Sequence, residues 1–526
     1  MVLACLITLA VFSPARQNQF VLIDDNVHIQ ENPLLNPPTW EKLKFIWTHP
    51  VLGLFVPVTY TGWAAQALLA KDPAKEGLKP QTFHKVSLLL HAANVSLAFA
   101  IVYTLYGHPL WAFLAALIFG IHPLQTEVVS WVSAQKDLFA GLFGLLALWL
   151  YLIWAKRDRL LAYAAAFVSF LLSVLAKPSS VTLGLMAMAL DVGILGRPWK
   201  RSLKALWPWF VIGLPILGIT KMLQPDEHIG QVPEWYLRPI IALDTIAFYL
   251  SKVFLPWGLT PDYSRTPQAL LHHPAVYYSW IVPVFLFFLL KRRLPNAFSL
   301  SVFFVAGILP VLGFLPFYFQ VFSTVADRYT YLSLLAWGLL LLQLVRHYPF
   351  TAVKATLTLL LFFYAMLSHQ QTKQWKTSWH LFTHTLIVNP GSLLAHNNLG
   401  TLFEEIGRYD DAYFHYEQST KLAPQSPAPW FNLARIHAMR GEFWKAKVLF
   451  QKVLTLAPDV ADAHYSLGVM ARREGQWTLA RQHLRRAAML QPQNKKMTEQ
   501  LSLLDKEWKV EKESLRAKAA VSQLEP

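Results

Sequence analysis

The chain has 526 residues, of which 54% are hydrophobic and 15% are charged, and its mean hydropathy is +0.34. This composition excludes an ordinary soluble globular protein and favours a membrane protein. The net charge is +16 at pH 7. Because much of this charge lies between apolar runs, it favours cytoplasmic loops over a nucleic-acid-binding surface. The single cysteine, Cys5, excludes an internal disulfide and a cysteine-cluster metal site.

Apolar runs predict an all-α membrane bundle. Residues 1–13 form a short run that lacks a basic segment before it and a clear cleavage motif after it, so we interpret it as a first transmembrane helix rather than a removable signal peptide. Further runs are each long enough for a ~30 Å hydrocarbon core, and they cover 84–106, 110–130, 137–155, 159–176, 179–196, 205–222, 276–290, 297–318, 329–346 and 351–369. Together they predict about eleven transmembrane helices in a domain spanning 1–369.

Basic clusters orient this predicted bundle. They lie between spans at 156–159, 197–204 and 291–293. The positive-inside rule puts them in the cytoplasm, so the long loop 14–83 and the chain after residue 369 are expected on the non-cytoplasmic side. Segment 239–257 carries Asp244 and Lys252, and we therefore expect it to lie at the interface or to re-enter.

A 34-residue period runs through the C-terminal part of the chain. It predicts three tetratricopeptide repeats, 393–426, 427–460 and 461–494. The residues that share the spacing are Leu399, Leu433 and Leu467, Gly407, Gly441 and Gly475, Ala412, Ala446 and Ala480, and Pro424, Pro458 and Pro492. Segment 370–392 is expected to be a linker with a degenerate half repeat, and 495–526 a capping helix and tail. Such repeats present a concave surface to a peptide or protein and seldom catalyse.

Two adjacent carboxylates, Asp24 and Asp25, lie in the predicted external loop 14–83. Two interpretations stay open. The pair is a solvated turn in which an aspartate caps a short helix, or it contains a general base, because a carboxylate in a partly dry cleft has a raised pKa and accepts a proton from an attacking hydroxyl. Adjacent residues of an irregular segment point in different directions, so at most one of the two would be the base.

Other ionisable residues are predicted on the same side of the membrane. They are His122, Glu127, Lys136, Asp137, Lys177, Asp327 and Arg328, with His84 and His91 on one face of a helix. Each has a structural alternative, such as a helix stop for His122, snorkelling for Lys136 and Arg328, or interfacial packing for His91. Ionisable groups near hydrocarbon are costly, so their gathering on one side favours a functional site.

Several segments carry a family resemblance in order along the chain. They are FVLIDDNVHIQENPLL, HKVSLLLHAANVSL, HPLQTEVVSWVSAQKDLFAGL, LAKPSSVTLGLMAMALDVGIL, WGLTPDYSRT and DRYTYLSLLAWG, followed by the repeats. This arrangement resembles the transmembrane and tetratricopeptide repeat-containing protein O-mannosyltransferases, as a bacterial-type relative. The resemblance implies a GT-C glycosyltransferase fold that transfers a sugar from a lipid phosphate on the external or lumenal side.

The resemblance also implies roles for particular residues. The catalytic candidates are Asp24, Asp25 and Glu127. Because the departing lipid phosphate is anionic, basic side chains must stabilise it, and the candidates for binding it are Arg328, Lys136 and Lys177. Further candidates are His122, Asp137 and His91. These residues demand no metal, although Glu127 with Asp24 could hold a divalent cation.

The predicted function is transfer of mannose or another hexose from a polyprenyl- or dolichyl-phosphate donor to Ser or Thr hydroxyls of proteins. Two alternatives stay open, a GT-C transferase that modifies a cell-envelope glycan or lipid, and a non-catalytic membrane-anchored tetratricopeptide scaffold. The expected partners are the lipid-linked donor, an acceptor polypeptide and membrane lipids, without nucleic acid. The expected location is the bacterial inner membrane, or the endoplasmic reticulum membrane in a eukaryote, with the repeats on the non-cytoplasmic side.

Overall fold

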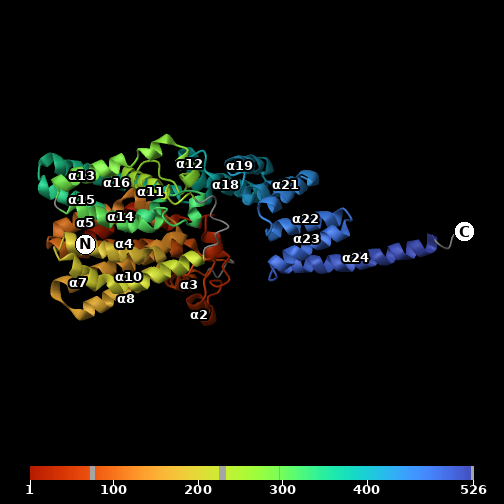
Figure 1. Cartoon of the computed structure of the whole chain (residues 1–526), viewed down its shortest axis with the longest axis horizontal. Coiled ribbons are helices and arrows are strands. Elements are labelled where there is room, and N and C mark those ends of the chain that lie inside the picture. Colours follow the sequence, from red (N-terminus) through yellow and green to blue (C-terminus); the bar gives the residue numbers. More distant parts are fainter. Residues whose placement is uncertain (72–76, 224–232, 295, 523–526) are drawn as a thin grey trace. The chain divides into compact units, whose positions relative to one another are not determined.

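The computed structural model describes residues 1–71, 77–223, 233–294 and 296–522 (Figure 1). The described residues form helices, with isolated β-bridges at Val51–Leu54 and Lys71–Leu78 and no β-strand. The predicted all-α class is therefore confirmed. The chain divides into two compact units, Met1–Ser392 and Leu393–Pro526.

The first unit is a bundle built around α4, α5 and α7, with α8 against α7 and α15 against α5. Its α-helices are α1 (Val2–Val11), α2 (Trp40–Thr48), α3 (Pro57–Ala70), α4 (Pro80–Tyr106), α5 (Pro109–Ile121), α6 (Thr126–Ser130), α7 (Gln135–Arg157), α8 (Leu160–Ala176), α9 (Leu183–Gly193), α10 (Trp199–Met222), α11 (Arg238–Phe254), α12 (Pro267–Leu271), α13 (Ile281–Arg293), α14 (Ala297–Ile308), α15 (Leu334–His347), α16 (Thr351–Gln374) and α17 (Ser378–Val388). Short 3₁₀ turns join several of them, including η5 (Pro178–Thr182) and η10 (Asp327–Thr330).

The prediction of about eleven transmembrane helices is wrong. Among the described residues, five helices are long and apolar enough to cross a membrane, or six if one bent helix pair forms a single span. The five are Pro80–Tyr106, Val132–Arg157, Trp199–Thr220, Pro274–Arg293 and Thr351–Gln374, and the bent pair is Pro109–Ile121 with Pro123–Ser130. Five membrane-capable helices still indicate a membrane protein.

Helix breaks explain the difference, because the length of an apolar run does not report them. The run 110–130 bends by 54° after Ile121, where Pro123 cannot continue the backbone hydrogen bonding of α5. The run 329–346 begins in a 3₁₀ turn, which leaves 14 residues in α15. Such a helix is about 21 Å long, shorter than the ~30 Å hydrocarbon core.

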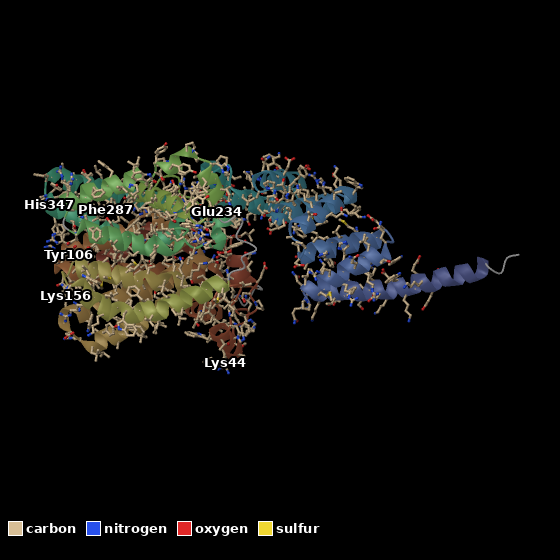
Figure 2. The ribbon with its side chains drawn as sticks, viewed as in Figure 1. Lys44, Tyr106, Lys156, Glu234, Phe287 and His347 are labelled. Atoms are coloured by element: carbon tan, nitrogen blue, oxygen red, sulfur yellow. The ribbon has the colours of Figure 1, made fainter. Side chains whose placement is uncertain are left out.

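The bundle has two chemically different ends. Figure 2 shows Tyr106, Lys156 and His347 at one end and Lys44 at the opposite end. Helix α7 begins with Lys136 in its first turn and ends beyond Lys156, so it connects the two ends. The basic cluster that contains Lys156 and the loop that contains Lys44 thus lie at opposite ends, as the predicted orientation requires. Which end faces the cytoplasm stays a prediction.

The segment 370–392 packs as part of the first unit. The Leu22 amide donates to Ser378 Oγ at 3.0 Å, and Asn389 Nδ2 donates to the Asp262 carbonyl at 3.0 Å. Ser392 Oγ donates to Asp262 Oδ2 at 2.6 Å. The start of helix α17 is thereby bound to the loop that contains Asp24 and Asp25, and the residues after α17 are bound to the loop that follows α11.

The second unit consists of three helix pairs and a final helix. They are α18 (Leu393–Glu405) with α19 (Tyr409–Leu422), α20 (Pro427–Met439) with α21 (Phe443–Leu456), α22 (Ala461–Arg473) with α23 (Trp477–Leu490), and α24 (Lys495–Ser522). The periodic Gly407, Gly441 and Gly475 have φ of +75°, +77° and +71°, so each supplies the left-handed turn residue between two helices. The periodic alanines are fully buried where paired helices approach each other.

The third repeat contains a hydrogen-bonded histidine pair. His464 Nε2 lies 2.9 Å from the Pro458 carbonyl, and His464 Nδ1 lies 2.9 Å from His483 Nδ1. A carbonyl only accepts, so Nε2 carries the proton and Nδ1 accepts from His483. In the second repeat, the indole Nε1 of Trp430 donates instead to the Pro424 carbonyl at 2.9 Å.

The first repeat contains the equivalent pair, two repeat lengths earlier in the chain. Its members are His396 and His415, whose Nδ1 atoms lie 2.9 Å apart. Burial, with a smaller contribution from the neighbouring His396, lowers the pKa of His415 to about 4. His415 is therefore neutral at pH 7, as one acceptor facing one donor in this pair requires.

The two ends of the bundle predict the accessibility of single cysteines. With Cys5 replaced by serine, Lys200→Cys reports on the basic end and Gln425→Cys on the second unit, since both positions are exposed. We expect an impermeant thiol reagent to label Gln425→Cys in intact cells and Lys200→Cys only after permeabilisation. Labelling of Lys200→Cys alone would invert the proposed orientation.

The buried alanine contacts predict a sensitive position in the repeats. Ala446 is fully buried in α21. We expect Ala446→Trp to destabilise the repeat unit by about 1–3 kcal/mol, because overpacking forces helices apart. Lys445→Trp, the same addition at the neighbouring exposed position, is the matched control. Equal melting curves for the two variants would contradict the assigned helix packing.

Candidate functional site

Residues from four segments gather where several helices of the first unit end. The segments are the loop with Asp24 and Asp25, the stretch from α6 to the start of α7 with Glu127, Lys136 and Asp137, the start of η5 with Lys177, and η10 with Arg328. Electrostatic interactions join Lys136 to Asp24, Arg328, Asp137 and Lys177. We call these residues the charged cluster.

Asp25 is buried and holds the surrounding backbone through hydrogen bonds. Its side chain is fully buried and accepts hydrogen bonds from the Val21 amide at 3.0 Å and from the Ser133 amide and hydroxyl at 2.8 and 2.5 Å. Burial raises the pKa of Asp25 to about 6, against the lowering effect of these donors. Its carboxylate thus fastens the loop that carries Asp24 to the turn before α7, and its full burial keeps it from an incoming acceptor hydroxyl.

Asp24 has the environment expected of a base. It is half-buried, and its carbonyl accepts the His28 amide at 2.9 Å, while no hydrogen bond of a described residue occupies its carboxylate. Burial, and to a smaller extent the charge of Lys136, lowers the pKa of His28 to about 4, while Asp24 opposes both effects. His28 is neutral at pH 7, and its Nδ1 lies 2.8 Å from the hydroxyl of Tyr60. Asp24 is therefore half-buried near His28 and Lys136, with a carboxylate that no described residue engages.

Glu127 and Arg328 form a buried ion pair across 201 residues of sequence. Arg328 donates to one Glu127 oxygen through its guanidinium, and its main-chain amide donates to the other at 3.0 Å. Exposure of the side chains is 8% for Arg328 and 2% for Glu127. Because both carboxylate oxygens are engaged, Glu127 orients Arg328 and is a poorer candidate for the base than Asp24.

Aromatic rings complete the environment of Arg328. Its guanidinium lies 4.3 Å from the ring centroid of Phe319, 4.8 Å from that of Tyr329 and 5.3 Å from that of Trp131. Guanidinium groups stack on aromatic faces while keeping their N–H groups for an anion. The sequence pattern did not single out Phe319 or Trp131, since aromatic residues are frequent throughout this membrane unit.

Lys177 and Asp137 form a second ion pair, while Lys136 makes none with a described residue. The Lys136 ammonium lies 5.8 Å from the ring centroid of Trp131. Arg328 and Lys177 thus each have a carboxylate partner. Lys136 is the cation of the charged cluster that is least neutralised by its neighbours.

A small cavity of about 30 Å³ opens between Asp137, Lys177, Arg328 and Tyr329. Ser179, Ser180 and Thr182 of η5 also line it. Apolar residues, among them Leu183 and Leu332, line the rest of it, and the cavity lies within the charged cluster.

Asp327 and two tyrosines support the turn that carries Arg328. Tyr263 donates to Asp327 Oδ1 at 2.8 Å, and the Tyr249 hydroxyl accepts the Ala326 amide at 3.1 Å. Burial raises the pKa of Asp327 to about 8, with Glu127 adding to the increase. Tyr263 lies in the segment WGLTPDYSRT, one of those that carry the family resemblance, but the resemblance assigned no role to this residue.

His122 and His91 are held outside the charged cluster. His122 Nδ1 accepts the Leu124 amide at 3.2 Å, and its Nε2 donates to the Val253 carbonyl at 3.1 Å. His91 Nε2 donates to the Gly120 carbonyl at 2.8 Å, while its Nδ1 accepts from Tyr331 at 2.9 Å. Both imidazoles have both nitrogens engaged, which fits a packing role for each.

The described residues contain no group of three or more His, Cys, Asp and Glu arranged to hold a metal ion. The divalent cation considered for Glu127 with Asp24 fits this geometry poorly. Both Glu127 oxygens face the positive Arg328, which disfavours a second cation at the same carboxylate.

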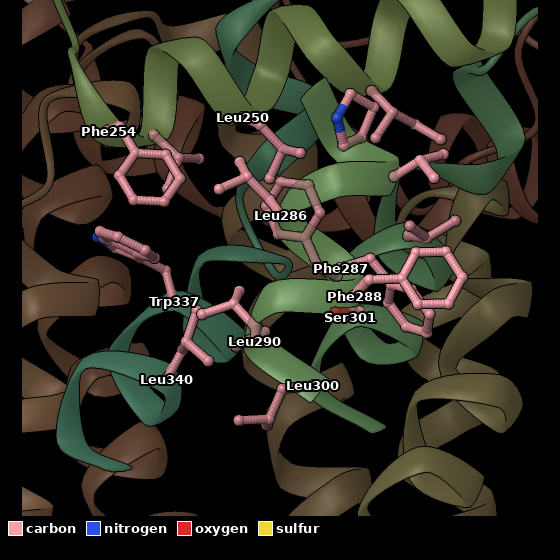
Figure 3. Close-up of a pocket in the computed structure, with 17 residues that line it drawn as sticks. Leu250, Phe254, Leu286, Phe287, Phe288, Leu290, Leu300, Ser301, Trp337 and Leu340 are labelled. Atoms are coloured by element: carbon pink, nitrogen blue, oxygen red, sulfur yellow. The ribbon is translucent and has the colours of Figure 1, made fainter. Parts of the chain in front are cut away.

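A larger apolar pocket of about 350 Å³ lies among α11, α13, α14 and α15 (Figure 3). Of the seventeen lining residues, all are aliphatic or aromatic except Ser301. Helix α11 runs from this pocket, which Val253 lines, toward the turn that carries Arg328. On the same helix, Tyr249 holds the residue that precedes Asp327.

Family models described as tetratricopeptide repeat match residues 405–468 and 445–495. Human protein O-mannosyl-transferase TMTC3 is 22% identical over 510 residues, covering 84% of this chain and 53% of its own length. Protein O-mannosyl-transferase F38B6.6 of Caenorhabditis elegans is 23% identical over 336 residues, covering 60% of this chain and 46% of its own. Protein O-mannosyl-transferase tmtc2 of Xenopus laevis is 40% identical over 76 residues, which are 14% of this chain and 9% of that protein.

The chain is thus similar over most of its length to proteins named protein O-mannosyl-transferase, and it carries tetratricopeptide repeats. It spans about half the length of the relatives that match it most extensively. Among solved structures, yeast Tom70 covers 76% of this chain at 11% identity and a TM-score of 0.20, a likeness too weak to carry an argument.

The different environments of the two aspartates predict different effects on stability. Asp25→Asn cannot accept all three hydrogen bonds, so we expect a loss of about 1–3 kcal/mol in stability of the first unit. The carboxylate of Asp24 accepts no hydrogen bond from the described residues, so Asp24→Asn should melt like the wild type. Thermal unfolding of both purified variants in the same detergent tests this, and a destabilised Asp24→Asn beside an unchanged Asp25→Asn would reverse the assignment.

Proposed function

We propose that the protein is a membrane glycosyltransferase of the GT-C type that moves mannose or another hexose from a polyprenyl- or dolichyl-phosphate donor to Ser or Thr hydroxyls of proteins. The observation that carries the proposal is the charged cluster, in which an unoccupied carboxylate, Asp24, shares a partly buried site with Lys136 and Arg328. The extended similarity to protein O-mannosyl-transferases supports the choice of sugar and acceptor.

Asp24 is the general base in this proposal. Its carboxylate takes the proton of the acceptor hydroxyl while that oxygen forms a bond to the anomeric carbon. The bond between the anomeric carbon and the lipid phosphate breaks on the opposite side, so the configuration inverts and the lipid phosphate leaves with the bonding electrons. Asp25 holds the loop that carries Asp24 and takes no proton.

Lys136 and Arg328 stabilise the departing phosphate. Lys136 has no ion-pair partner among the described residues, so its charge is available to an incoming anion. It lies in the first turn of α7, where main-chain N–H groups and the helix dipole also favour an anion. Arg328, oriented by Glu127, adds a planar donor fork, whereas Lys177 is more strongly committed to Asp137.

The apolar pocket offers room for part of the lipid chain of the donor. It has the aliphatic and aromatic lining that an isoprenoid requires, and α11 joins it to the turn before Arg328. The tetratricopeptide repeats indicate a protein-binding role and suit an acceptor polypeptide. We propose the non-cytoplasmic side of a bacterial inner membrane, or the lumenal side of the endoplasmic reticulum, for both the site and the repeats.

The roles of Asp24 and Lys136 predict separable kinetic defects. We expect Asp24→Asn to lower kcat by ~10²–10⁴-fold with little change in donor binding, because it preserves shape and removes basicity. Lys136→Met should raise the donor KM as well as lower kcat, because it removes charge from the phosphate site. The assay is transfer from labelled polyprenyl-phosphate mannose by the reconstituted full chain, with mass spectrometry of the product.

Two further outcomes discriminate among the candidate functions. Asp25→Asn, assayed at a temperature where it remains folded, should retain much more activity than Asp24→Asn. Label in a cell-envelope glycan or lipid rather than in protein would favour the alternative acceptor. If neither Asp24→Asn, Asp25→Asn nor Glu127→Gln changed transfer, the proposed site would be refuted. An inactive wild type with intact repeats would favour the scaffold function.

A further inference from the structure

The small cavity in the charged cluster contains one unusual acceptor. Asp137 is 5% exposed and lines the cavity. Its Oδ1 is paired with Lys177, but its Oδ2 is buried and has no hydrogen-bond partner among the described residues. A buried carboxylate oxygen without a donor is costly, so its position in a polar cavity indicates a ligand that supplies one.

The charges around Asp137 identify the kind of group that fits. Both neighbouring cations already have carboxylate partners, Lys177 with Asp137 and Arg328 with Glu127. An anionic group inside the cavity would meet the unpaired Oδ2 of Asp137 at close range and be repelled, so the phosphate that Lys136 and Arg328 bind is expected outside the cavity. A neutral O–H group would instead donate to Oδ2 and form a charge-assisted hydrogen bond.

The size of the cavity limits that group. A cavity of about 30 Å³ holds water-sized groups, so it has room for a hydroxyl of a sugar. Ser179, Ser180 and Thr182 along its other side add hydroxyl groups that can donate or accept. A pyranose ring at the mouth of the cavity could insert one hydroxyl toward Asp137.

We infer that Asp137 is a specificity-determining residue that accepts a hydrogen bond from one hydroxyl of the transferred sugar. This inference rests on the proposed function and adds to it a separation of roles within the charged cluster. Lys136 and Arg328 bind the phosphate of the donor, while the cavity beside Asp137 recognises the hexose. A site that hydrogen-bonds a substrate hydroxyl rejects analogues that lack it, because its polar group is then left unpaired.

The test pairs one variant with a set of donors. Wild type and Asp137→Asn, as reconstituted full chains, are assayed with polyprenyl-phosphate mannose and with its 2-, 3-, 4- and 6-deoxy analogues. We expect Asp137→Asn to lower kcat/KM for the parent donor by about 10- to 100-fold, the value of one hydrogen bond to a charged group. For one deoxy donor alone, wild type and variant should be equally slow, because the interacting hydroxyl is already absent.

Deoxyfluoro donors give an independent readout. Fluorine at the recognised position accepts weakly and cannot donate, so it should be rejected by the carboxylate of the wild type and tolerated by the amide of Asp137→Asn. The ratio of kcat/KM between the wild type and Asp137→Asn, taken for each donor, cancels the intrinsic effect of fluorine on sugar reactivity. The inference requires this ratio to reverse at the same position that the deoxy series identifies.

A second variant, which also changes Lys177, is the control for misfolding and for a purely structural role of Asp137. Asp137→Asn leaves Lys177 without its partner, so the double variant Asp137→Asn with Lys177→Met removes both charges and should show the same dependence on the donor. An equal penalty for every donor, in the single and the double variant, would overturn the inference and assign Asp137 a structural role. Absence of transfer by the wild type with every donor would instead refute the proposed function on which the inference rests.

Discussion

The buried ion pair between Glu127 and Arg328 is the interaction on which the arrangement of the site depends. Both groups lose most of their hydration, and such a loss is tolerable only when geometry and additional hydrogen bonds compensate for it. Here the Arg328 amide provides the additional hydrogen bond, and three aromatic rings surround the guanidinium. The pair thereby fixes the turn at η10 against α6, and the rest of the charged cluster is arranged around that junction.

A second layer of contacts extends this junction into the bundle. Helix α11 contributes Val253 to the apolar pocket and Tyr249 to the support of η10, so a displacement of this helix would reach both places. The loop after α11 contributes Tyr263 to Asp327, and through Asp262 it binds the end of the first unit at Ser392. The chain therefore enters its repeats directly from a segment hydrogen-bonded to the surroundings of the site.

The sequence was sufficient to predict what depends on local pattern. Helical class, the 34-residue period and the gathering of ionisable residues from distant segments all followed from spacing and from the cost of charge near hydrocarbon. It did not predict which of Asp24 and Asp25 is engaged, because that depends on Ser133, 108 residues away. The number of membrane spans was overestimated, because hydropathy does not report helix breaks such as the one before Pro123.

Partner assignment was the other part that sequence reasoning could not supply. The sequence showed Glu127, Lys136 and Asp137 as ionisable residues near a membrane surface but not which residue each one contacts. The structure distinguishes them only through their neighbours, since Glu127 is committed to Arg328, Asp137 has one free oxygen and Lys136 has no ion pair among the described residues.

The histidine pairs in the first and third repeats show how two positions of a repeat become dependent on each other. At the position of Trp430 and His464, a donor is needed to satisfy the proline carbonyl, and tryptophan supplies it without adding an acceptor. Histidine meets it equally well, but its second nitrogen then requires a donor on the adjacent helix, which His483 supplies to His464. Exchange of tryptophan for histidine at this position therefore adds an acceptor that a donor nineteen positions later satisfies, so the residues at the two positions of a repeat are coupled.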